Sequence, residues 1–337
     1  MICWTAFIKL HNMEENLFQP RTDLSQLHEA VGQLREEIGK VIIGQQEMVK
    51  LIVAALLADG HVLIEGVPGV AKTLTARLVA RCMALHFSRI QFTPDLMPSD
   101  VLGTSIFNPT EGSFQFKRGP VFGNIILVDE INRAPAKTQA ALFEVMEEKQ
   151  VTVDGYSHPM ERPFMVLATQ NPVEQEGTYR LPEAQLDRFL FKITVPYPTE
   201  EEEIAILNRF HQSPGEEIAA QVKEVISAAQ ISELRRLVRL VLIEEKLLQF
   251  IARLVTATRS HKSVYLGASP RASLAIMMSA KATAAMQGRD FVTPEDVLEM
   301  AIPVLRHRII LTPEKEMEGA TEDDVIKEII HSLEIPR

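Results

Sequence analysis

The chain has 337 residues, which at about 150 residues per domain suggests two domains. Hydrophobic residues make up 46% of it and the formal net charge is −10. A sizeable core is therefore possible, whereas constitutive non-specific binding to nucleic acid, which needs a basic face, is disfavoured. The longest apolar run, Leu51–Ala58, is far shorter than the about 18 residues of a membrane span. Two cysteines cannot build a disulfide framework, so we expect a cytoplasmic protein without a membrane segment.

The first 22 residues carry no sustained helix or strand pattern, and we expect residues 1–22 to form a poorly ordered N-terminal extension. Met13 begins a stretch, MEENLFQPRT, that resembles an ordinary start of a protein. The residues before it have neither the basic region nor the cleavage site of a secretory signal. We interpret residues 1–12 as an upstream extension of the reading frame or an expression artefact.

Residues 23–198 alternate between helical and strand patterns. Apolar residues recur every three or four positions over 24–38, and a second helix is predicted over 45–58. Short apolar runs follow at 61–65, 89–92, 125–129, 164–168 and 189–195, with helical patterns at 72–84 and 137–148 between them. Several runs lack alternation, as strands buried on both faces of a parallel sheet do. The order predicts a doubly wound α/β domain.

Residues 199–337 are predicted to form an all-helical second domain. Helices are expected over about 200–211, 217–228, 232–239, 244–259, 270–286 and 294–302. Thr199 followed by Glu202 is typical of a helix N-terminus, and the acidic run 200–203 favours the same position; an acidic interaction surface is the alternative. Thr293 before Pro294 predicts another helix start, and Gly288 a helix end.

Residues 66–73, GVPGVAKT, follow a predicted strand and open a predicted helix. They fit the phosphate-binding pattern G-x-x-x-x-G-K-[ST], with Ala71 in place of the second glycine. Glycines let consecutive N–H groups face phosphate oxygens, and the helix N-terminus adds a favourable field. We expect Lys72 to reach the β- and γ-phosphates of ATP and the Thr73 hydroxyl to ligate Mg²⁺.

Two further strand ends carry polar side chains suited to the same chemistry. Asp129 ends the apolar run 125–129 and is placed to hold Mg²⁺ through water, while Glu130 follows it and would polarise the attacking water. The run 164–168 precedes TQNP, in which the amide of Asn171 is suited to orienting that water or sensing the γ-phosphate. An isolated Asn-Pro pair is more often a turn, but the order of these segments favours the functional interpretation.

Ser269-Pro270-Arg271 opens the helix predicted over 270–286. Ser269 is the expected N-cap, which leaves Arg271 in the first turn, where a cation opposes the helix dipole at a cost of about 0.3–1 kcal/mol. An anion in front of Arg271 would remove this conflict, and a nucleotide triphosphate would serve. A surface salt bridge is the alternative.

The segments GVPGVAKT, ILVDEINRAPAKTQAALFEVMEE, ATQNP, LPEAQLDRF and GASPRA occur in this order, and with them the chain resembles the MoxR family of AAA+ ATPases. The resemblance extends from about Val41 to Arg308. It implies a P-loop AAA+ core with a five-stranded parallel sheet of order 5-1-4-3-2, followed by a helical lid. It also implies homo-oligomeric rings, hexamers in this family, that hydrolyse ATP with Mg²⁺.

The resemblance assigns roles to single residues. The implied catalytic set is Glu130, Asn171 as sensor 1, Arg188 as the arginine finger offered to a neighbouring subunit, and Arg271 as sensor 2. Thr73 and Asp129 are the implied metal ligands, and the VIIGQ segment would line the adenine pocket. The expected nucleotide-binding residues are Val41, Ile42, Gly44, Gly66, Pro68, Gly69, Val70, Ala71, Lys72, Thr73, Leu74 and Asp129. Arg180 stands where the family often has proline, so it is a second candidate for the finger.

Two insertions into the core point to a partner. Residues 103–122 alternate in polarity, and Asp154-Gly155 within 150–160 is a strong hairpin signal. Both match the helix-2 insert and pre-sensor-1 hairpin of the AAA+ clade that includes magnesium chelatase. We expect a chaperone-like ATPase that remodels a separately encoded protein, in this family one with a von Willebrand A-type domain. The alternatives are a nucleic-acid motor or loader, disfavoured by the few basic residues in the inserts, and a metal-chelatase-type motor subunit.

Overall fold

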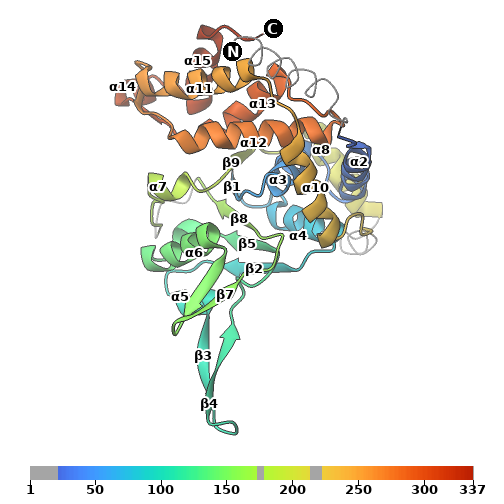
Figure 1. Cartoon of the computed structure of the whole chain (residues 1–337), viewed down its shortest axis with the longest axis vertical. Coiled ribbons are helices and arrows are strands. Elements are labelled where there is room, and N and C mark those ends of the chain that lie inside the picture. Colours follow the sequence, from blue (N-terminus) through green and yellow to red (C-terminus); the bar gives the residue numbers. More distant parts are fainter. Residues whose placement is uncertain (1–21, 173–177, 213–221, 337) are drawn as a thin grey trace, which may run out of the picture.

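The computed structural model describes residues 22–172, 178–212 and 222–336. The expected N-terminal extension lies outside these residues except for Thr22. Two layers build the chain: an α/β core, and a helical region that lies across one end of it (Figure 1). Within the described ranges, none of the helices combines the length and apolarity that crossing a bilayer requires.

Five parallel strands form the central sheet, and their order is that expected for an AAA+ core. From one edge to the other they are β2 (Phe87–Gln91), β5 (Ile125–Asp129), β8 (Met165–Gln170), β1 (Val62–Gly66) and β9 (Phe191–Val195). All four neighbouring pairs are parallel. Numbered as core strands along the chain, this is the predicted order 5-1-4-3-2, which is therefore confirmed.

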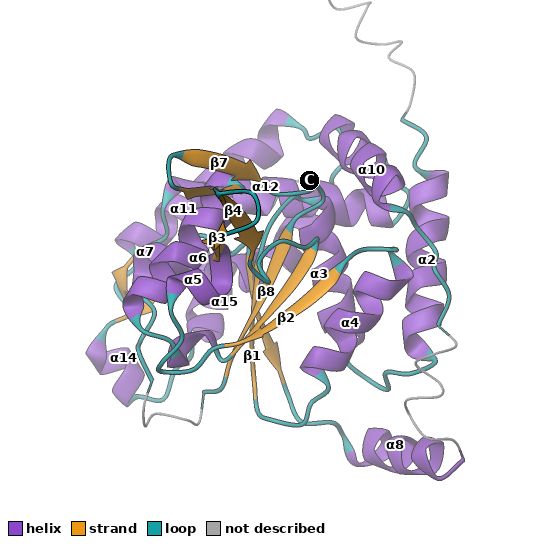
Figure 2. Cartoon of the chain, turned by 90° about the horizontal axis from the view of Figure 1, so that it is seen from below, coloured by secondary structure: helices purple, strands orange, loops and turns teal. Residues whose placement is uncertain are grey.

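Helices cover both faces of the sheet (Figure 2). One face, including Val62 and Ile64, packs against α2 (Ser25–Gly39), α3 (Gln46–Leu57) and α4 (Lys72–Cys82). The opposite face, including Leu63 and Val128, packs toward α5 (Pro98–Leu102) and α6 (Ala136–Glu148). Burial on both faces explains why the strands read as continuous apolar runs rather than as alternating ones.

The lid is helical, as expected. Its helices are α8 (Glu200–Gln212), α10 (Ala228–Leu240), α11 (Glu245–Ser260), α12 (Pro270–Met286), α13 (Pro294–Leu305), α14 (Pro313–Met317) and α15 (Glu322–Ser332). The helices α14 and α15 were not predicted individually, and neither was a short ladder in which β10 (Val264–Leu266) pairs antiparallel with β11 (Ile310–Leu311). Two residues suffice for such a ladder, and a segment that short carries no readable periodicity. The main apolar cluster runs without interruption from α2 and α3 into the lid, where α12 contacts both helices.

The prediction of a helix over 217–228 is wrong for residues 222–227, the part of this range that is described and not helical. Residues 217–221 lie outside the described part of the chain, and residues 222–227 are not helical. The backbone N–H groups of Val225 and Ile226 both donate to the carbonyl of Cys82, at 2.7 and 3.1 Å. The segment thus docks on the end of α4, and Val222 and Ile226 are buried there. Their spacing of four residues imitates a helix pattern.

Two hairpins leave the core where insertions were predicted. The first pairs β3 (Gly103–Asn108) with β4 (Ser113–Arg118), and the second pairs β6 (Gln150–Val153) with β7 (Tyr156–Pro159). Asp154 and Gly155 both have positive φ, as a tight type I′ turn requires. Figure 1 shows β3 and β4 extending far from the rest of the molecule. We refer to the two hairpins together, residues 103–118 and 150–159, as the hairpin arm.

The two hairpins are joined side by side. The hydroxyl of Ser105 donates to Asp154 at 2.5 Å, and the rings of Phe116 and His158 stack with centroids 4.1 Å apart. Beyond this junction Phe107 and Phe114 face each other across the strands, 50% and 73% exposed. The arm therefore presents an aromatic pair near its end.

A buried histidine ties the start of β1 to two neighbouring segments. His61 accepts from the N–H of Val166 at Nδ1, 3.0 Å away, so its Nε2 carries the hydrogen and donates to the carbonyl of Met146 at 3.2 Å. Burial is the main reason why the pKa of His61 falls to about 4, and the nearby ammonium of Lys149 acts in the same direction.

We expect the free energy of unfolding to fall by about 3 kcal/mol between pH 7 and pH 4 because of His61 alone. The unfolded imidazole binds a proton near pH 6.5, whereas the folded one binds it only near pH 4. The unfolded state therefore holds the extra proton between these values, and acidification favours it. Urea titrations across this range measure the effect.

His61→Gln, whose amide can replace both hydrogen bonds, should flatten this part of the pH dependence. His331→Gln, which changes an exposed histidine, is the matched control and should leave the wild-type slope. An unchanged slope in His61→Gln would contradict the assignment.

Candidate nucleotide site

The loop between β1 and α4 has the backbone of a phosphate-binding loop. Gly69 (φ +88°) and Ala71 (φ +56°) both lie in the left-handed region, and Ala71 adopts it at a cost of about 1–2 kcal/mol that glycine would avoid. This turn lets α4 begin at Lys72 with no side chain capping its first turn, so its first amides face the loop. The ammonium of Lys72 donates to the carbonyl of Gly66 at 2.5 Å and so lies within the loop. Pro68 is exposed at its tip.

A cavity of about 260 Å³ lies beside this loop, between the core and the first lid helix. Its walls are mostly apolar. They comprise Val41, Ile42, Ile43 and Gln45 before α3; Gly69, Val70, Ala71 and Leu74 from the loop and α4; and Pro198, Ile206, Arg209 and Phe210 at the entry to the lid. A flat heterocycle suits such a slot. Most of the expected base-binding residues therefore meet at one place.

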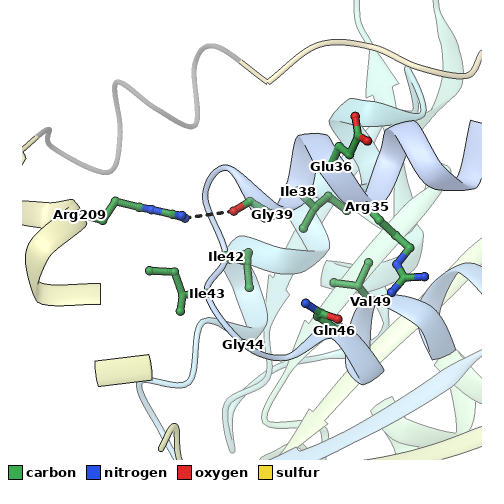
Figure 3. Close-up of a pocket in the computed structure, with 10 residues that line it drawn as sticks. All are labelled: Arg35, Glu36, Ile38, Gly39, Ile42, Ile43, Gly44, Gln46, Val49 and Arg209. Atoms are coloured by element: carbon green, nitrogen blue, oxygen red, sulfur yellow. Dashed lines mark hydrogen bonds between the residues drawn. The ribbon is translucent and has the colours of Figure 1, made fainter. Parts of the chain in front are cut away.

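A larger cavity of about 430 Å³ lies on the other side of Ile42 and Ile43 (Figure 3). Its walls come from α2, α3 and the segment between them, and Arg209 of α8 donates there to the carbonyl of Gly39 at 3.2 Å. Gly44 belongs to this side: a Cβ on it would lie 2.5 Å from the Glu202 carboxylate. We assign the base to the smaller cavity because the phosphate-binding loop forms part of its wall.

Gln45 shows a chemical fit to adenine. Its amide nitrogen donates to the carbonyl of Val70 at 2.6 Å, which fixes the orientation of the amide because the oxygen cannot donate. Oε1 of Gln45 is then buried and has no partner among the described residues. An unmade bond of this kind costs about 1–3 kcal/mol, and the amino group of adenine is a donor of the type required.

The acidic pair at the end of β5 is held by side chains from both adjacent strands and by Arg133. Asp129 is 7% exposed. Its carboxylate accepts a hydrogen bond from Arg89 of β2 at 2.6 Å and another from the Thr169 hydroxyl of β8 at 3.2 Å. Glu130 (φ +58°) accepts from Gln91 at 2.7 Å and pairs with Arg133 at 3.1 Å. Both carboxylates are thus oriented before any ligand arrives.

The donors present fit a magnesium ion that is completed by phosphate and water. No group of three or more acidic, histidine or cysteine side chains in the described ranges could hold a metal alone. A P-loop site needs no such group, since one hydroxyl and one carboxylate supplement phosphate oxygens. Thr73, at the start of α4, and Asp129 supply that pair.

Asn171 directly follows β8, which lies between β1 and β5. It is 8% exposed. Because parallel strands end at one edge of the sheet, Asn171 shares this edge with Gly66 and Asp129. The structure thus brings together Lys72, Thr73, Asp129, Glu130 and Asn171.

The two predicted arginines lie at the opposite edge. Arg188 precedes β9, and it pairs with Glu147 at 3.2 Å. Arg271 pairs with the same carboxylate at 3.0 Å. Met146, next to Glu147, is bonded to His61 at the start of β1, which locates the cluster at the amino-terminal ends of the strands. The phosphate-binding loop begins at the other end of β1, about 13 Å of strand away.

The expected role of Arg271 toward a nucleotide stays a prediction. The anion in front of Arg271 is Glu147, which matches the salt-bridge alternative, and the lid docks so that α12 begins far from the phosphate-binding loop. Ser269 caps the helix as predicted, accepting from the N–H of Arg271 at 3.2 Å. Arg180 lies elsewhere: it is exposed and shares a small cavity with Glu65 and Gln170, toward the phosphate-binding edge.

Some site residues were not predicted, and others were predicted only as part of a segment or with another role. Arg89 and Gln91 alternate on β2, a signal that points both side chains to one face, but only the strand order places that face beside Asp129. Gln45 lies in the VIIGQ segment that was expected to line the adenine pocket, but the orientation of its amide needed the structure. Ile206 and Phe210 of α8 line the base cavity, although they were assigned to the lid.

Comparison with known proteins agrees with this geometry. A profile of the ATPase family associated with various cellular activities (AAA) matches residues 61–191, and a profile of the AAA lid domain matches residues 256–329. Together with the strand order, these matches define an AAA+ core followed by its lid, the class of nucleotide-binding ATPases that use a divalent metal.

Individual relatives narrow the class. The chain is 46% identical over 310 residues to the uncharacterized protein YeaC of Bacillus subtilis, covering 92% of this chain and 96% of that protein. It is 44% identical over 310 residues to Chaperone MoxR1 of Mycobacterium tuberculosis, covering 89% and 81%. The crystal structure of a predicted ATPase from Cytophaga hutchinsonii matches with a TM-score of 0.86 at 42% identity, over 98% of this chain and 100% of that one. The chain belongs to the MoxR family of AAA+ ATPases.

Proposed function

We propose that this protein hydrolyses ATP with Mg²⁺ as a homo-oligomeric ring of six chains and uses the energy to remodel or mature a protein partner. The observation that carries the hydrolytic part is the meeting of Lys72, Asp129 and Glu130 at one sheet edge, beside an apolar base cavity. The name of the mycobacterial relative, a chaperone, supports the second part.

Each group at the edge has a separate task. The base cavity holds adenine, with Gln45 accepting from its amino group, and the amides at the start of α4 with Lys72 hold the phosphates. Bound Mg²⁺, held by Thr73 and through water by Asp129, would neutralise charge on the β- and γ-phosphates. Glu130 accepts a hydrogen bond from the attacking water, and Asn171 orients that water or the γ-phosphate.

Arg188 and Arg271 cannot reach the nucleotide of their own chain, because they lie at the opposite sheet edge. We infer that both act on the nucleotide of a neighbouring chain, where their charge stabilises the transition state. Arg188 suits the role of the finger better than Arg180, because Arg188 is held against α6 by the carbonyl of Phe143 at 3.0 Å.

The hairpin arm is the part of the chain best suited to contact a partner. It combines exposed aromatic side chains, Phe107, Phe114 and Tyr156, with a rigid junction to the core. Arg118, one of its few cations, is engaged with Glu161 and with the Phe122 ring. This composition favours a polypeptide partner over nucleic acid.

Lys72→Ala should abolish ATP binding, whereas Glu130→Gln should bind ATP and hydrolyse it at least about 100-fold more slowly. Lys72 contacts phosphate in the ground state, while Glu130 acts on water only during the reaction. Fluorescent-nucleotide binding and phosphate release measure the two effects. Hydrolysis at the wild-type rate by Glu130→Gln would remove Glu130 from the catalytic role.

Arg188→Ala should bind ATP normally and lose about 10³-fold or more of its turnover. Mixing it with Lys72→Ala, also inactive, should restore part of the activity, because some interfaces then combine an intact loop with an intact finger. Arg180→Ala is the control and should stay near wild type. No recovery in rings shown to exchange subunits would contradict action between chains.

Replacing either tip of the arm, residues 108–113 or 154–157, by a short Gly-Ser turn should leave basal hydrolysis nearly intact and abolish partner-stimulated turnover. Tips on a rigid scaffold carry binding rather than fold. Equal loss of basal hydrolysis would make the arm a structural part of the ring. Loss of single-stranded DNA binding shown by the wild type at physiological salt would favour a nucleic-acid motor.

A further inference from the structure

Glu147 binds two arginines at once. Its Oε1 accepts from Nη2 of Arg271 at 3.0 Å, and its Oε2 lies 3.2 Å from Nη1 of Arg188 and 3.4 Å from Nη1 of Arg271. The cluster thus has two positive charges and one negative charge.

The backbones that carry these arginines are fixed to each other. Asp187 accepts from Arg308 at 2.7 Å through one oxygen and from Ser269 at 2.9 Å through the other. Asp187 precedes Arg188, and Ser269 caps the helix that contains Arg271. The spacing between the two arginines is therefore set by one buried connection between core and lid.

Arg308 makes this connection unusually rigid. Its side chain is 3% exposed. Besides the Asp187 carboxylate, its donors reach four backbone carbonyls, those of Asp187, Phe189, Leu190 and Val304. Such a network holds the segment before β9 in one conformation.

The cluster itself, unlike its support, is accessible. Arg188, Arg271 and Glu147 have side chains that are 29%, 53% and 39% exposed. Ion pairs this exposed contribute little to stability, so an incoming dianion can replace the carboxylate. Phosphate matches the fork of an arginine as well as a carboxylate does, and it carries more charge.

We propose that Glu147 is the resting ligand of this arginine pair, and that a phosphate group of the nucleotide held by a second copy of this chain displaces it. The proposal rests on the function proposed above, in which both arginines act between chains. Glu147 keeps the pair assembled, with one of its two positive charges balanced, until a loaded neighbour arrives. It is a positioning residue, because it touches the arginines and not the reacting atoms.

Glu147→Gln tests the proposal, with Glu148→Gln as the matched control, since Glu148 is the next residue of α6, exposed, and without an ion pair in the described structure. Hydrolysis per chain is measured against protein concentration at saturating ATP. Glu147→Gln should reach half of its maximal rate at a protein concentration about three- to tenfold lower than wild type, because the arginines no longer lose a carboxylate when chains associate. Glu148→Gln should follow the wild type.

A double variant separates this role from mere support. Adding Arg271→Ala to Glu147→Gln should raise the protein concentration at half-maximal rate back to the wild-type value or above it. If Glu147→Gln is folded by circular dichroism and needs the same or a higher protein concentration than wild type, the carboxylate supports the arginines rather than competing for them, and the proposal is overturned.

A second measurement does not depend on assembly. In a Lys72→Ala background, inorganic triphosphate should bind about three- to tenfold more tightly when Glu147→Gln is added than when Glu148→Gln is added, by calorimetry. Equal affinities would overturn the proposal. Failure of the proposed function looks different: Arg188→Ala and Arg271→Ala would then hydrolyse ATP like the wild type at every protein concentration.

Discussion

Parallel pairing forces every strand of the sheet to end at the same edge, and the candidate site depends on this constraint. β8 lies between β1 and β5, so the phosphate-binding loop, the acidic pair and Asn171 follow three adjacent strands. Neighbouring strands are about 4.8 Å apart, which brings side chains from distant parts of the sequence within the length of a triphosphate. The position of each group follows from its place at the end of a buried strand.

The same constraint separates the arginines from that site. Arg188 enters β9 at the amino-terminal edge, and Arg308 of the lid fixes it there. The lid therefore contributes twice: α8 closes the base cavity at the phosphate edge, and the segment from Ser269 onward joins the arginine edge. A second connection holds the core and the lid together. In it, Asp59 accepts hydrogen bonds from Arg235 of α10 at 2.8 Å and from Lys149 at 2.6 Å. Burial opposes the ionisation of Asp59, yet the two cations outweigh it and lower the pKa of that carboxyl.

Much of the core could be predicted because its signals are local. Buried strands such as 125–129 can be recognised by their continuous apolar residues. The sequence between β1 and α4 predicts a phosphate-binding loop even with Ala71 in a glycine position. The lid helices with clear caps, such as those that begin after Ser269 and Thr293, were found for the same reason.

What the sequence could not provide is long-range docking. The pairing of Arg89 with Asp129 requires the strand order, and the meeting of Arg188, Glu147 and Arg271 requires the orientation of the lid on the core. The segment 222–227 has a helix-like pattern because two buried residues are four apart, but its hydrogen bonds to Cys82 hold it in a non-helical conformation. In each case the decisive partner lies far away in the chain.

The strand that orients the acidic pair is also the one that leads to the hairpin arm. Beyond Gln91, which holds Glu130, the N–H of Phe92 donates to the carbonyl of Asp129 at 2.9 Å, and the chain then continues through α5 into β3. The hydroxyl of Thr138, in the helix after the acidic pair, donates to the carbonyl of Leu96 in this connection at 2.6 Å. These bonds connect the acidic pair to β2 and to the segment that leads into α5. The arm extends from that point, so the covalent connection between the acidic pair and the arm runs through β2 and α5 and does not involve the lid.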